Sequence, residues 1–443
     1  MRTRINICCM LITLLATYGC NKEMPPGDKE ALAFTKKHSA VVATSWYRLL
    51  TEITRTKPYA PPQTIRILSY TGITLYESVV RGMPSYQSMY THLTGNIIEA
   101  DKKTAYYWPA AANAAIARIS SRLMSNYPSP NLSPLIELEN AFNNQFAIII
   151  SPELLNNSIA YGQQVADFIY AWSTTDGTLT PESIPAVCPS YTPLGGPGNW
   201  IPTPPGFLPA AGACQGQLRT FLPGIINSLP VTHPVPYSTE PESDFFHAAN
   251  EIYQISFNLT PDDIRISQSW RDLIGVNFNA PGHILRLTSQ IVEKENMDLE
   301  KASVLFAKQG MAMFDAIAVI FKRKFEFSLL RPVTYIRNVQ GHSNWNSLYP
   351  TPQHPSYPAV APGAAGAAVV ILEKTFGYHY NFLDSTQHTL YGTWTYSDFD
   401  QMLEDVGKSR TLSGINFQFA VNDGKLIGRR IGEKIDALPF KKL

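Results

Sequence analysis

Hydrophobic positions recur every three or four residues through much of the chain. In the alanine-rich stretch 110–123, the large apolar residues Ile116, Ile119 and Leu123 follow the spacing of one face of an α-helix. The stretch 154–172 repeats this period, and no alternating run bounded by hairpin signals appears between the two. The pattern predicts a succession of amphipathic helices rather than a sheet.

A second pattern, in residues 302–321, is almost continuously apolar. It is interrupted by few polar residues, among them Lys308 and Asp315. We interpret it as a central, mostly buried helix and not as a membrane span, because charged residues interrupt it. We expect Asp315 to be a paired carboxylate of the core rather than a catalytic group. Helices are predicted to resume at about residue 244 and to continue to the end.

The segment 181–240 breaks the helical pattern, with 13 prolines in 60 positions. Two interpretations remain open: a disordered linker, or an ordered loop on the surface of the helical body. The aromatic residues Trp200, Phe207 and Phe221 favour order. We therefore predict one all-α body over residues 28–443, a helical bundle in two halves with this proline-rich loop on its surface.

Composition narrows the classes of function. The chain has 443 residues, of which 44% are hydrophobic and 16% charged, and its formal net charge is +1. These values suit a compact globular protein with a large core. There is no broad basic field that would favour nucleic acid and no polybasic stretch for anionic lipid, so recognition of an anion has to be local.

The N-terminus has the features of an export signal. Arg2 and Arg4 precede an apolar run that ends at Gly19-Cys20, and this end resembles a bacterial lipobox. We predict a signal peptide at 1–19, a lipid on Cys20 and a polar tether over 20–27. The protein would then be exported to the periplasm or the cell-envelope surface and contact the membrane through its lipid. An ordinary cleaved signal with a chance cysteine is the alternative.

The remaining cysteines follow from this processing. Cys8 and Cys9 leave with the signal and Cys20 carries lipid, which leaves Cys188 and Cys214 in an oxidising compartment. We predict a disulfide between them, worth about 3 kcal/mol in the chain-entropy model. Two unrelated buried thiols are the alternative. We expect no metal site, since no spacing of zinc ligands is present.

Three cations are the candidate binding residues. Lys324 and Arg331 are seven positions apart, and Pro332 disfavours helix at Arg331, so we expect Lys324 near the end of the central helix and Arg331 in the turn that follows. Arg410 is expected on a later helix, about 397–412. Cations from separate elements can surround a tetrahedral oxyanion. The alternative is that they lie on the surface and cover apolar neighbours.

The order of motifs strengthens the first interpretation. Lys-x6-Arg-Pro at 324–332 is followed by the proline-rich stretch 351–363 and then by Ser409-Arg410 with Asn416 six residues after the arginine. This series resembles the vanadium haloperoxidase and phosphatidic acid phosphatase type 2 superfamily, whose motifs are Lys-x6-Arg-Pro, Pro-Ser-Gly-His and Ser-Arg-x5-His. The resemblance covers roughly residues 30–437 and is strongest from 300 onward. It implies an all-α bundle with an oxyanion pocket.

The chain departs from this resemblance at the reactive residues. The histidine that attacks phosphorus or coordinates vanadium falls at Asn416, and the second histidine falls at Ala361. The preceding serine and glycine fall at Ala359 and Val360. An amide is a poor nucleophile and ligand, and losing a nucleophile can reduce a rate about a million-fold. The resemblance therefore implies a degenerate site in which Lys324, Arg331, Arg410 and Asn416 bind an oxyanion without ordinary turnover.

Three functional hypotheses remain. The first is an exported haloperoxidase- or acid-phosphatase-like protein that binds phosphate or vanadate, or another small molecule, but is catalytically impaired. The second is a non-catalytic binding or scaffold lipoprotein whose anion pocket is vestigial. The third is an active haloperoxidase or phosphatase with a reorganised site, in which His354, seven positions before Ala361, compensates. We expect no cofactor beyond a bound anion.

Overall fold

Helices make up almost all the regular structure, as the sequence predicts. The structure is a computed structural model that describes residues 34–57, 59–99, 104–127, 132–178, 191–273 and 275–442. Within this part, the only sheet has two antiparallel strands, β1 (Phe382–Asp384) and β2 (Trp394–Tyr396). The predicted signal peptide, Cys20 and Cys188 lie outside the described residues, so lipidation and the disulfide with Cys214 stay predictions.

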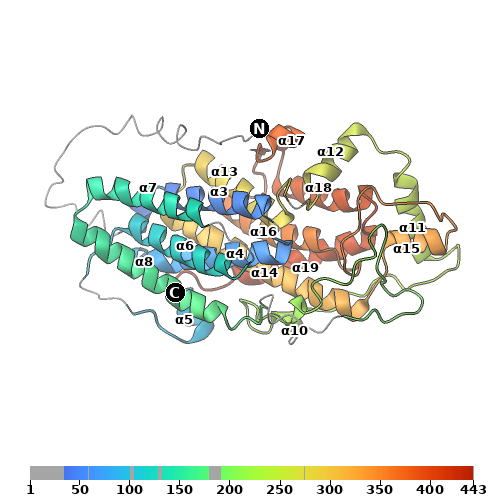
Figure 1. Cartoon of the computed structure of the whole chain (residues 1–443), viewed down its shortest axis with the longest axis horizontal. Helices are drawn as coiled ribbons and strands as arrows, with labels where there is room; N and C mark the ends of the chain where they lie inside the picture. Colours follow the sequence, from blue (N-terminus) through green and yellow to red (C-terminus); the bar gives the residue numbers. More distant parts are fainter. Residues whose placement is uncertain are drawn as a thin grey trace.

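The N-terminal half is a group of helices that lies on the left of Figure 1. Proline at the first or second position, which is compatible with a helix start, opens several of them. The elements are η1 (Thr35–Lys37), α3 (Val41–Thr56), α4 (Pro61–Val79), η2 (Val80–Gly82), α5 (Met89–Thr94), α6 (Trp108–Ser125), α7 (Ser133–Ile149) and α8 (Pro152–Ser173).

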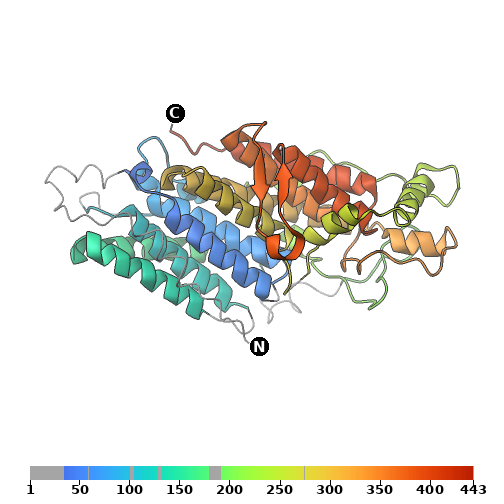
Figure 2. The same cartoon turned by 90° about the horizontal axis from the view of Figure 1, so that it is seen from above.

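Most helices of the C-terminal half lie toward the other end of the molecule, as Figures 1 and 2 show from two directions. A connecting segment with η3 (Gln215–Gln217) and α10 (Ile225–Ser228) leads into it. Its helices are α11 (Asp244–Ile255), α12 (Pro261–Ser269), α13 (Ala280–Lys294), α14 (Leu299–Phe327), α15 (Pro332–Asn338), α16 (Val360–Phe376), α17 (His388–Tyr391), α18 (Phe399–Leu412) and α19 (Gln418–Asp436).

Helix α14 is the central helix predicted from the apolar run. It begins at the N-cap Asp298, whose carboxylate accepts from the backbone of Lys301, and it packs against α4 on one side and α16 and α19 on the other. By length and composition it could cross a membrane, but 89% of its most apolar window is buried within the protein. It is therefore a core helix that joins the two halves.

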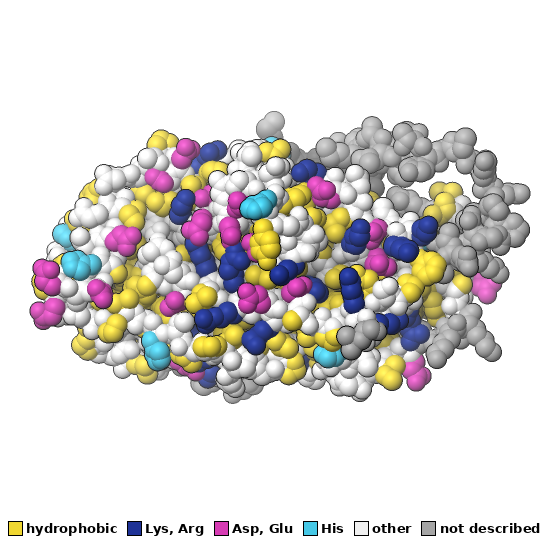
Figure 3. Space-filling model, turned by 180° about the vertical axis from the view of Figure 1, so that it is seen from behind, with side chains coloured by type: hydrophobic (Ala, Val, Ile, Leu, Met, Phe, Trp, Pro, Cys, Tyr) yellow, Lys and Arg dark blue, Asp and Glu magenta, His cyan; other side chains and the backbone are white. Residues whose placement is uncertain are grey.

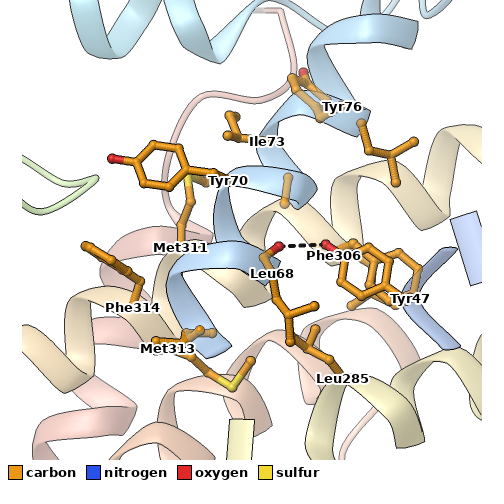
Figure 4. Close-up of a cluster of buried hydrophobic side chains, with 14 of the residues drawn as sticks. Tyr47, Leu68, Tyr70, Ile73, Tyr76, Leu285, Phe306, Met311, Met313 and Phe314 are labelled. Carbon is orange, nitrogen blue, oxygen red and sulfur yellow. Dashed lines mark hydrogen bonds between the residues drawn. The ribbon is translucent and has the colours of Figure 1, made fainter. Parts of the chain in front are cut away.

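Aromatic and aliphatic side chains from α3, α4, α13 and α14 meet in the close-up of Figure 4. Tyr47 of α3 stacks on Phe306 of α14 with ring centroids 3.9 Å apart, and its hydroxyl donates to the carbonyl of Leu68 on α4 at 3.0 Å. The buried tyrosine hydroxyl thus has the partner that burial requires. The cluster to which these residues belong also includes buried residues of α16 and α19, so one core serves both halves.

Helices α16 and α19 approach each other along a stripe of glycines. A Cβ on Gly428 would lie 2.0 Å from the carbonyl oxygen of Gly363, and one on Gly424 would lie 2.3 Å from that of Ala359. Only glycine allows backbones to come so close. This packing matters for the site because α16 begins beside the predicted degenerate positions and α19 begins just after Asn416.

The described part of the proline-rich segment, from residue 191 on, is an ordered loop that packs against α14 and against residues 328–330, which follow this helix. Trp200 and Phe221 are buried, as the prediction of order required, but Phe207 is 62% exposed and does not hold the loop. Asp315 of α14 accepts hydrogen bonds from the backbone N–H groups of Phe221 and Leu222 at 2.7 and 2.8 Å. The carboxylate is partnered within the core, by backbone donors.

Candidate functional site

Lys324 lies in the last turn of α14 with its side chain fully buried. Its Nζ donates to the carbonyl oxygens of Pro355 at 2.7 Å and Ser356 at 3.1 Å. Removal of the ammonium group from water, followed by the nearby charge of Arg331, lowers the pKa of Lys324 well below its usual value. Burial therefore disfavours the ammonium form of Lys324, and two backbone carbonyls are its hydrogen-bond acceptors.

Arg331 is the N-cap residue of α15 and is 1% exposed. Its Nε donates to the carbonyl of His354 at 2.9 Å, one terminal nitrogen to that of Ile415 at 2.8 Å, and the other to that of Pro352 at 3.2 Å. Burial, and then the charge of Arg410, lower its pKa to about 9. Arg331 thus ties the proline-rich stretch to the segment that precedes α19.

Arg410 comes from the end of α18 and is also buried. Its Nε donates to Ser409 Oγ at 3.0 Å, one terminal nitrogen donates to Asp272 Oδ2 at 3.4 Å, and the other donates to the carbonyl of Trp270. Burial lowers the pKa of Arg410, and the charge and hydrogen bond of Asp272 oppose that effect. Asp272 offsets part of the positive charge of the site.

Asn416 follows α18 and precedes α19, and it is 4% exposed. Its Nδ2 donates to the carbonyl of Ser356 at 2.7 Å and to the hydroxyl of the same residue at 3.2 Å. Lys324 uses the same carbonyl, and the neighbouring Ile415 carbonyl accepts from Arg331. Lys324, Arg331 and Asn416 are thus connected through the segments 352–356 and 415–416. Arg410 adds to this group because its charge lowers the pKa of Arg331.

The charge balance of this cluster is unusual for a protein interior. In the part of the chain that the structure describes, Asp272 is the only carboxylate paired with any of the three cations, and it pairs with Arg410. On the outer face in Figure 3, by contrast, basic and acidic side chains are interspersed. Buried cations are normally matched by opposite charge, so Lys324 and Arg331 form a centre of positive charge that is incompletely compensated.

Three positions at which the chain departs from the superfamily motif, Ala359, Val360 and Ala361, lie at the start of α16. Ala359 is its N-cap residue and donates its backbone N–H to the carbonyl of Ala420, on α19, at 2.9 Å. Ala361 is buried, with 5% exposed, and its methyl group can neither donate nor accept a proton. This contact places the N-terminus of α16 against the beginning of α19.

His354 lies beside Arg331 rather than beside a group that it could activate. Its Nδ1 is 3.2 Å from a terminal nitrogen of Arg331, and its ring lies 5.2 Å from that of Phe321. Since a guanidinium can only donate, Nδ1 accepts and carries no proton in this contact, and its 3.3 Å approach to the carbonyl oxygen of Pro355 is then not a hydrogen bond. Burial, and then the charges of Lys324 and Arg331, lower the pKa of His354 well below its usual value. The imidazole is therefore held neutral.

Sequence analysis did not identify two residues that contact Arg410 in the site. Asp272 and Trp270 lie in the connection between α12 and α13, 138 and 140 residues before Arg410, and no motif marks them. Ser356 was visible within the proline-rich stretch but had no predicted role, whereas its carbonyl and hydroxyl receive hydrogen bonds from Lys324 and Asn416. Over the described residues, no group of His, Cys, Asp and Glu is placed to hold a metal ion.

The fold and the cluster together define a class: an all-α bundle with buried cations at the ends of α14 and α18. A family model described as the VCPO second helical-bundle domain matches residues 304–438. These residues include all three cations, Ala361 and Asn416. This match, together with the 26% identical structure described below, supports the vanadium haloperoxidase-like superfamily for this chain.

Solved structures of haloperoxidases share the fold over nearly the whole chain. The crystal structure of a bacterial vanadium-dependent iodoperoxidase has a TM-score of 0.81 at 26% identity, and the match covers 94% of this chain and 98% of the iodoperoxidase chain. A holo-type bacterial vanadium-dependent chloroperoxidase has a TM-score of 0.67 at 13% identity, covering 87% and 94%. An apo-type bacterial chloroperoxidase gives 0.65, at 14% identity, covering 87% and 96%. No curated protein sequence gives a significant match.

Proposed function

We propose that this protein binds a phosphate-sized oxyanion, phosphate or vanadate, among Lys324, Arg331 and Arg410, with Asn416 lining the pocket, and that it does not turn over substrate at an ordinary rate. The observation that carries the proposal is the incomplete charge compensation of the buried cations. An oxyanion would supply the missing negative charge and accept charge-assisted hydrogen bonds.

Donor capacity supports the same proposal. Lys324 makes two of the three hydrogen bonds that its ammonium can donate, and Arg331 makes four of the five available to its guanidinium. Arg410 makes three of its five. We propose that the remaining N–H groups, on three side chains from separate elements, donate to the oxygens of one tetrahedral anion.

Vanadate as a coordinated cofactor fits these residues poorly. Coordination needs a nitrogen with an available lone pair, and the amide nitrogen of Asn416 has none and donates to Ser356. His354 Nδ1 is bonded to Arg331. We therefore treat vanadate as an anion held by charge and hydrogen bonds, and we assign no catalytic step to it.

Calorimetric titration with phosphate and with vanadate tests the binding proposal. The wild-type protein is expected to bind one anion, and the double variant Arg331→Ala/Arg410→Ala to bind none. The matched control is Arg48→Ala/Arg122→Ala, which removes two partly exposed, ion-paired arginines from the other half and should bind as the wild type does. A wild-type protein without affinity would favour the non-catalytic scaffold lipoprotein instead.

The likeness to an iodoperoxidase makes halide oxidation the first activity to assay, beside phosphate-monoester hydrolysis. We expect neither above background, with or without vanadate, because positions 361 and 416 offer no acid, base or nucleophile. Turnover that disappears in Arg410→Ala would instead support the reorganised active site, and a His354→Ala variant would then test its compensating role.

For the N-terminus we propose export and anchoring by a lipid on Cys20, on the strength of the charged start, the short apolar run and the Gly19-Cys20 end. Mass spectrometry of membrane-extracted protein should find the modification at Cys20. Cys20→Ala should move the protein to the soluble fraction, and a wild-type protein that is soluble and unmodified would contradict the proposal.

A further inference from the structure

The three-residue connection between the end of α14 and Arg331 includes one residue with a constrained backbone. Ser328 ends α14 with φ +48°, a left-handed conformation that L side chains adopt rarely. Ser328, Leu329 and Leu330 lead from the end of α14, whose last turn holds Lys324, to Arg331, so the backbone at Ser328 sets the direction in which the chain leaves the helix. A residue held in such a conformation needs contacts that keep it there.

Those contacts come from residues 191–212, which we call the strap. The hydroxyls of Tyr191 and Ser328 form a hydrogen bond of 2.8 Å, and the backbone N–H of Trp200 donates to the carbonyl of Ser328. Gly198 accepts from the backbone of Leu330 at 3.0 Å, within an antiparallel bridge. The strap thus pairs with the connection residue by residue.

The same strap also contacts the segment whose carbonyls hold the cations. The hydroxyls of Thr203 and Thr351 are hydrogen bonded, and both residues are buried. Further along, Ala211 donates its backbone N–H to the carbonyl of Gln353 at 2.7 Å. The carbonyls of residues 352, 354, 355 and 356 accept from Lys324 or Arg331. The strap therefore contacts both the connection 328–330 and the segment 352–356, whose carbonyls accept hydrogen bonds from Lys324 and Arg331.

We propose that the strap positions the anion site and that Tyr191 is a positioning residue, acting through Ser328 on the relative placement of Lys324 and Arg331. The proposal rests on the proposed function for its binding readout. Tyr191 suits the role because its ring is separately anchored, 4.8 Å from Phe325 and 6.4 Å from Trp200. Removing the hydroxyl alone should therefore leave the strap in place and release Ser328.

The experiment compares phosphate binding by the wild type and by Tyr191→Phe, Ser328→Gly and the double variant. Loss of the one hydrogen bond is expected to raise the Kd for phosphate about tenfold in Tyr191→Phe. Glycine adopts φ +48° without penalty, so Tyr191→Phe/Ser328→Gly should recover most of the affinity. Tyr378→Phe, which removes an exposed hydroxyl bonded to Lys374, is the control and should bind as the wild type does.

Hydrogen exchange gives a readout that needs no anion. In Tyr191→Phe, the amides of Leu330 and Ser356, which donate to Gly198 and Leu329, should exchange faster than in the wild type, and the control should not change. If the wild type binds phosphate and Tyr191→Phe binds equally well, the positioning role is overturned. If the wild type binds none, the proposed function fails, and unchanged exchange at these two amides would separately overturn the positioning role.

Discussion

Lys324 and Asn416 donate to one and the same carbonyl oxygen, that of Ser356, at 3.1 and 2.7 Å. The site therefore has a shared anchor on the proline-rich stretch, and the side chain at position 416 is part of it. An amide at this position has a structural use, since its nitrogen bonds both the carbonyl and the hydroxyl of Ser356. Replacing Asn416 therefore also changes the hydrogen bonding of the Ser356 carbonyl, to which Lys324 donates.

Four substitutions together should restore some reactivity: Ala359→Ser, Val360→Gly, Ala361→His and Asn416→His. They supply the residues that the superfamily resemblance places there, and Lys324, Arg331 and Arg410 are not substituted. We expect peroxide-dependent iodide oxidation with vanadate to rise above the background of the wild type, although far below an ordinary enzyme. A steady-state assay checks this, and the same variant with Arg410→Ala should return to background. No increase would mean that the cations are not placed for catalysis.

The depressed pKa of Lys324 predicts opposite pH dependences for stability and for binding. Between that lowered pKa and the usual 10.5, the unfolded chain binds a proton that the folded protein lacks. Stability of the wild type relative to Lys324→Met should therefore increase as pH rises through this window. Affinity for an anion should decrease over the same range, because an anion favours the ammonium form.

Urea unfolding of both proteins from pH 7 to pH 10, beside titration with sulfate, measures these two trends. Sulfate keeps its charge over this range, so a loss of affinity reports on the protein. The difference in unfolding free energy between wild type and Lys324→Met isolates the lysine, since other groups are common to both. A difference that does not vary with pH would show that the pKa of Lys324 is ordinary.

Asp315 should make stability depend on pH in the acid range. Burial raises its pKa from 3.8 to about 7, although the N–H groups of Leu222 and Phe221 oppose this. The folded state then holds a proton that the unfolded state has lost, so stability should fall as pH rises from 4 to 7, by up to about 1.4 kcal/mol per pH unit.

The matched variant is Asp315→Asn, which cannot titrate. An amide offers one acceptor to the two backbone donors, so at pH 5 the variant should be less stable by about 1–3 kcal/mol. The difference from the wild type should shrink toward pH 7.5. Urea unfolding at the two pH values measures it, and a constant difference would contradict a raised pKa for Asp315.

Contiguous patterns in the sequence predicted much of this structure. The apolar run 302–321 lies within α14, and the helix expected at 397–412 is α18. The spacing of Lys324 and Arg331 placed them at a helix end and in the next turn because local backbone rules decide that. Asp272 could not be predicted in the same way, because its contact with Arg410 depends on how distant helices pack.

The proline-rich loop shows a second limit. Proline content predicted irregular backbone but not which aromatic residues would be buried, and Trp200 is buried while Phe207 is exposed. The left-handed Ser328 had no sequence signal either, since serine is not a residue that favours positive φ. Such a conformation depends on tertiary contacts with the strap.

Gly428→Ala should destabilise the C-terminal half. Alanine favours a helix over glycine by about 1 kcal/mol, but here the added Cβ would lie 2.0 Å from the carbonyl oxygen of Gly363. The added Cβ should push α16 and α19 apart, and the packing lost in this way should exceed the gain in helix propensity. The free energy of unfolding should therefore fall by about 1–3 kcal/mol. Glu433→Ala, an exposed change on the same helix, is the control. Thermal unfolding measures both, and a stabilised Gly428→Ala would mean that the helices are not in such close contact.

The last prediction concerns a buried pair beside Arg410. His283 Nε2 lies 2.7 Å from Asp384 Oδ2, both side chains are 2% exposed, and the His283 ring stacks on Trp270 with centroids 4.2 Å apart. The carbonyl of Trp270 accepts from Arg410. His283→Phe keeps an aromatic ring against Trp270 but leaves the Asp384 carboxylate without this partner, which should reduce stability by about 3–5 kcal/mol.

A second substitution distinguishes lost charge pairing from lost packing. His283→Phe/Asp384→Leu removes the carboxylate that has lost its imidazole partner, so urea unfolding should show much of the stability recovered. Because Thr386 also donates to Asp384, recovery should be incomplete. A double variant no more stable than His283→Phe would show that the imidazole acts through packing alone. Phosphate affinity should follow the same order, because Trp270 helps to hold Arg410.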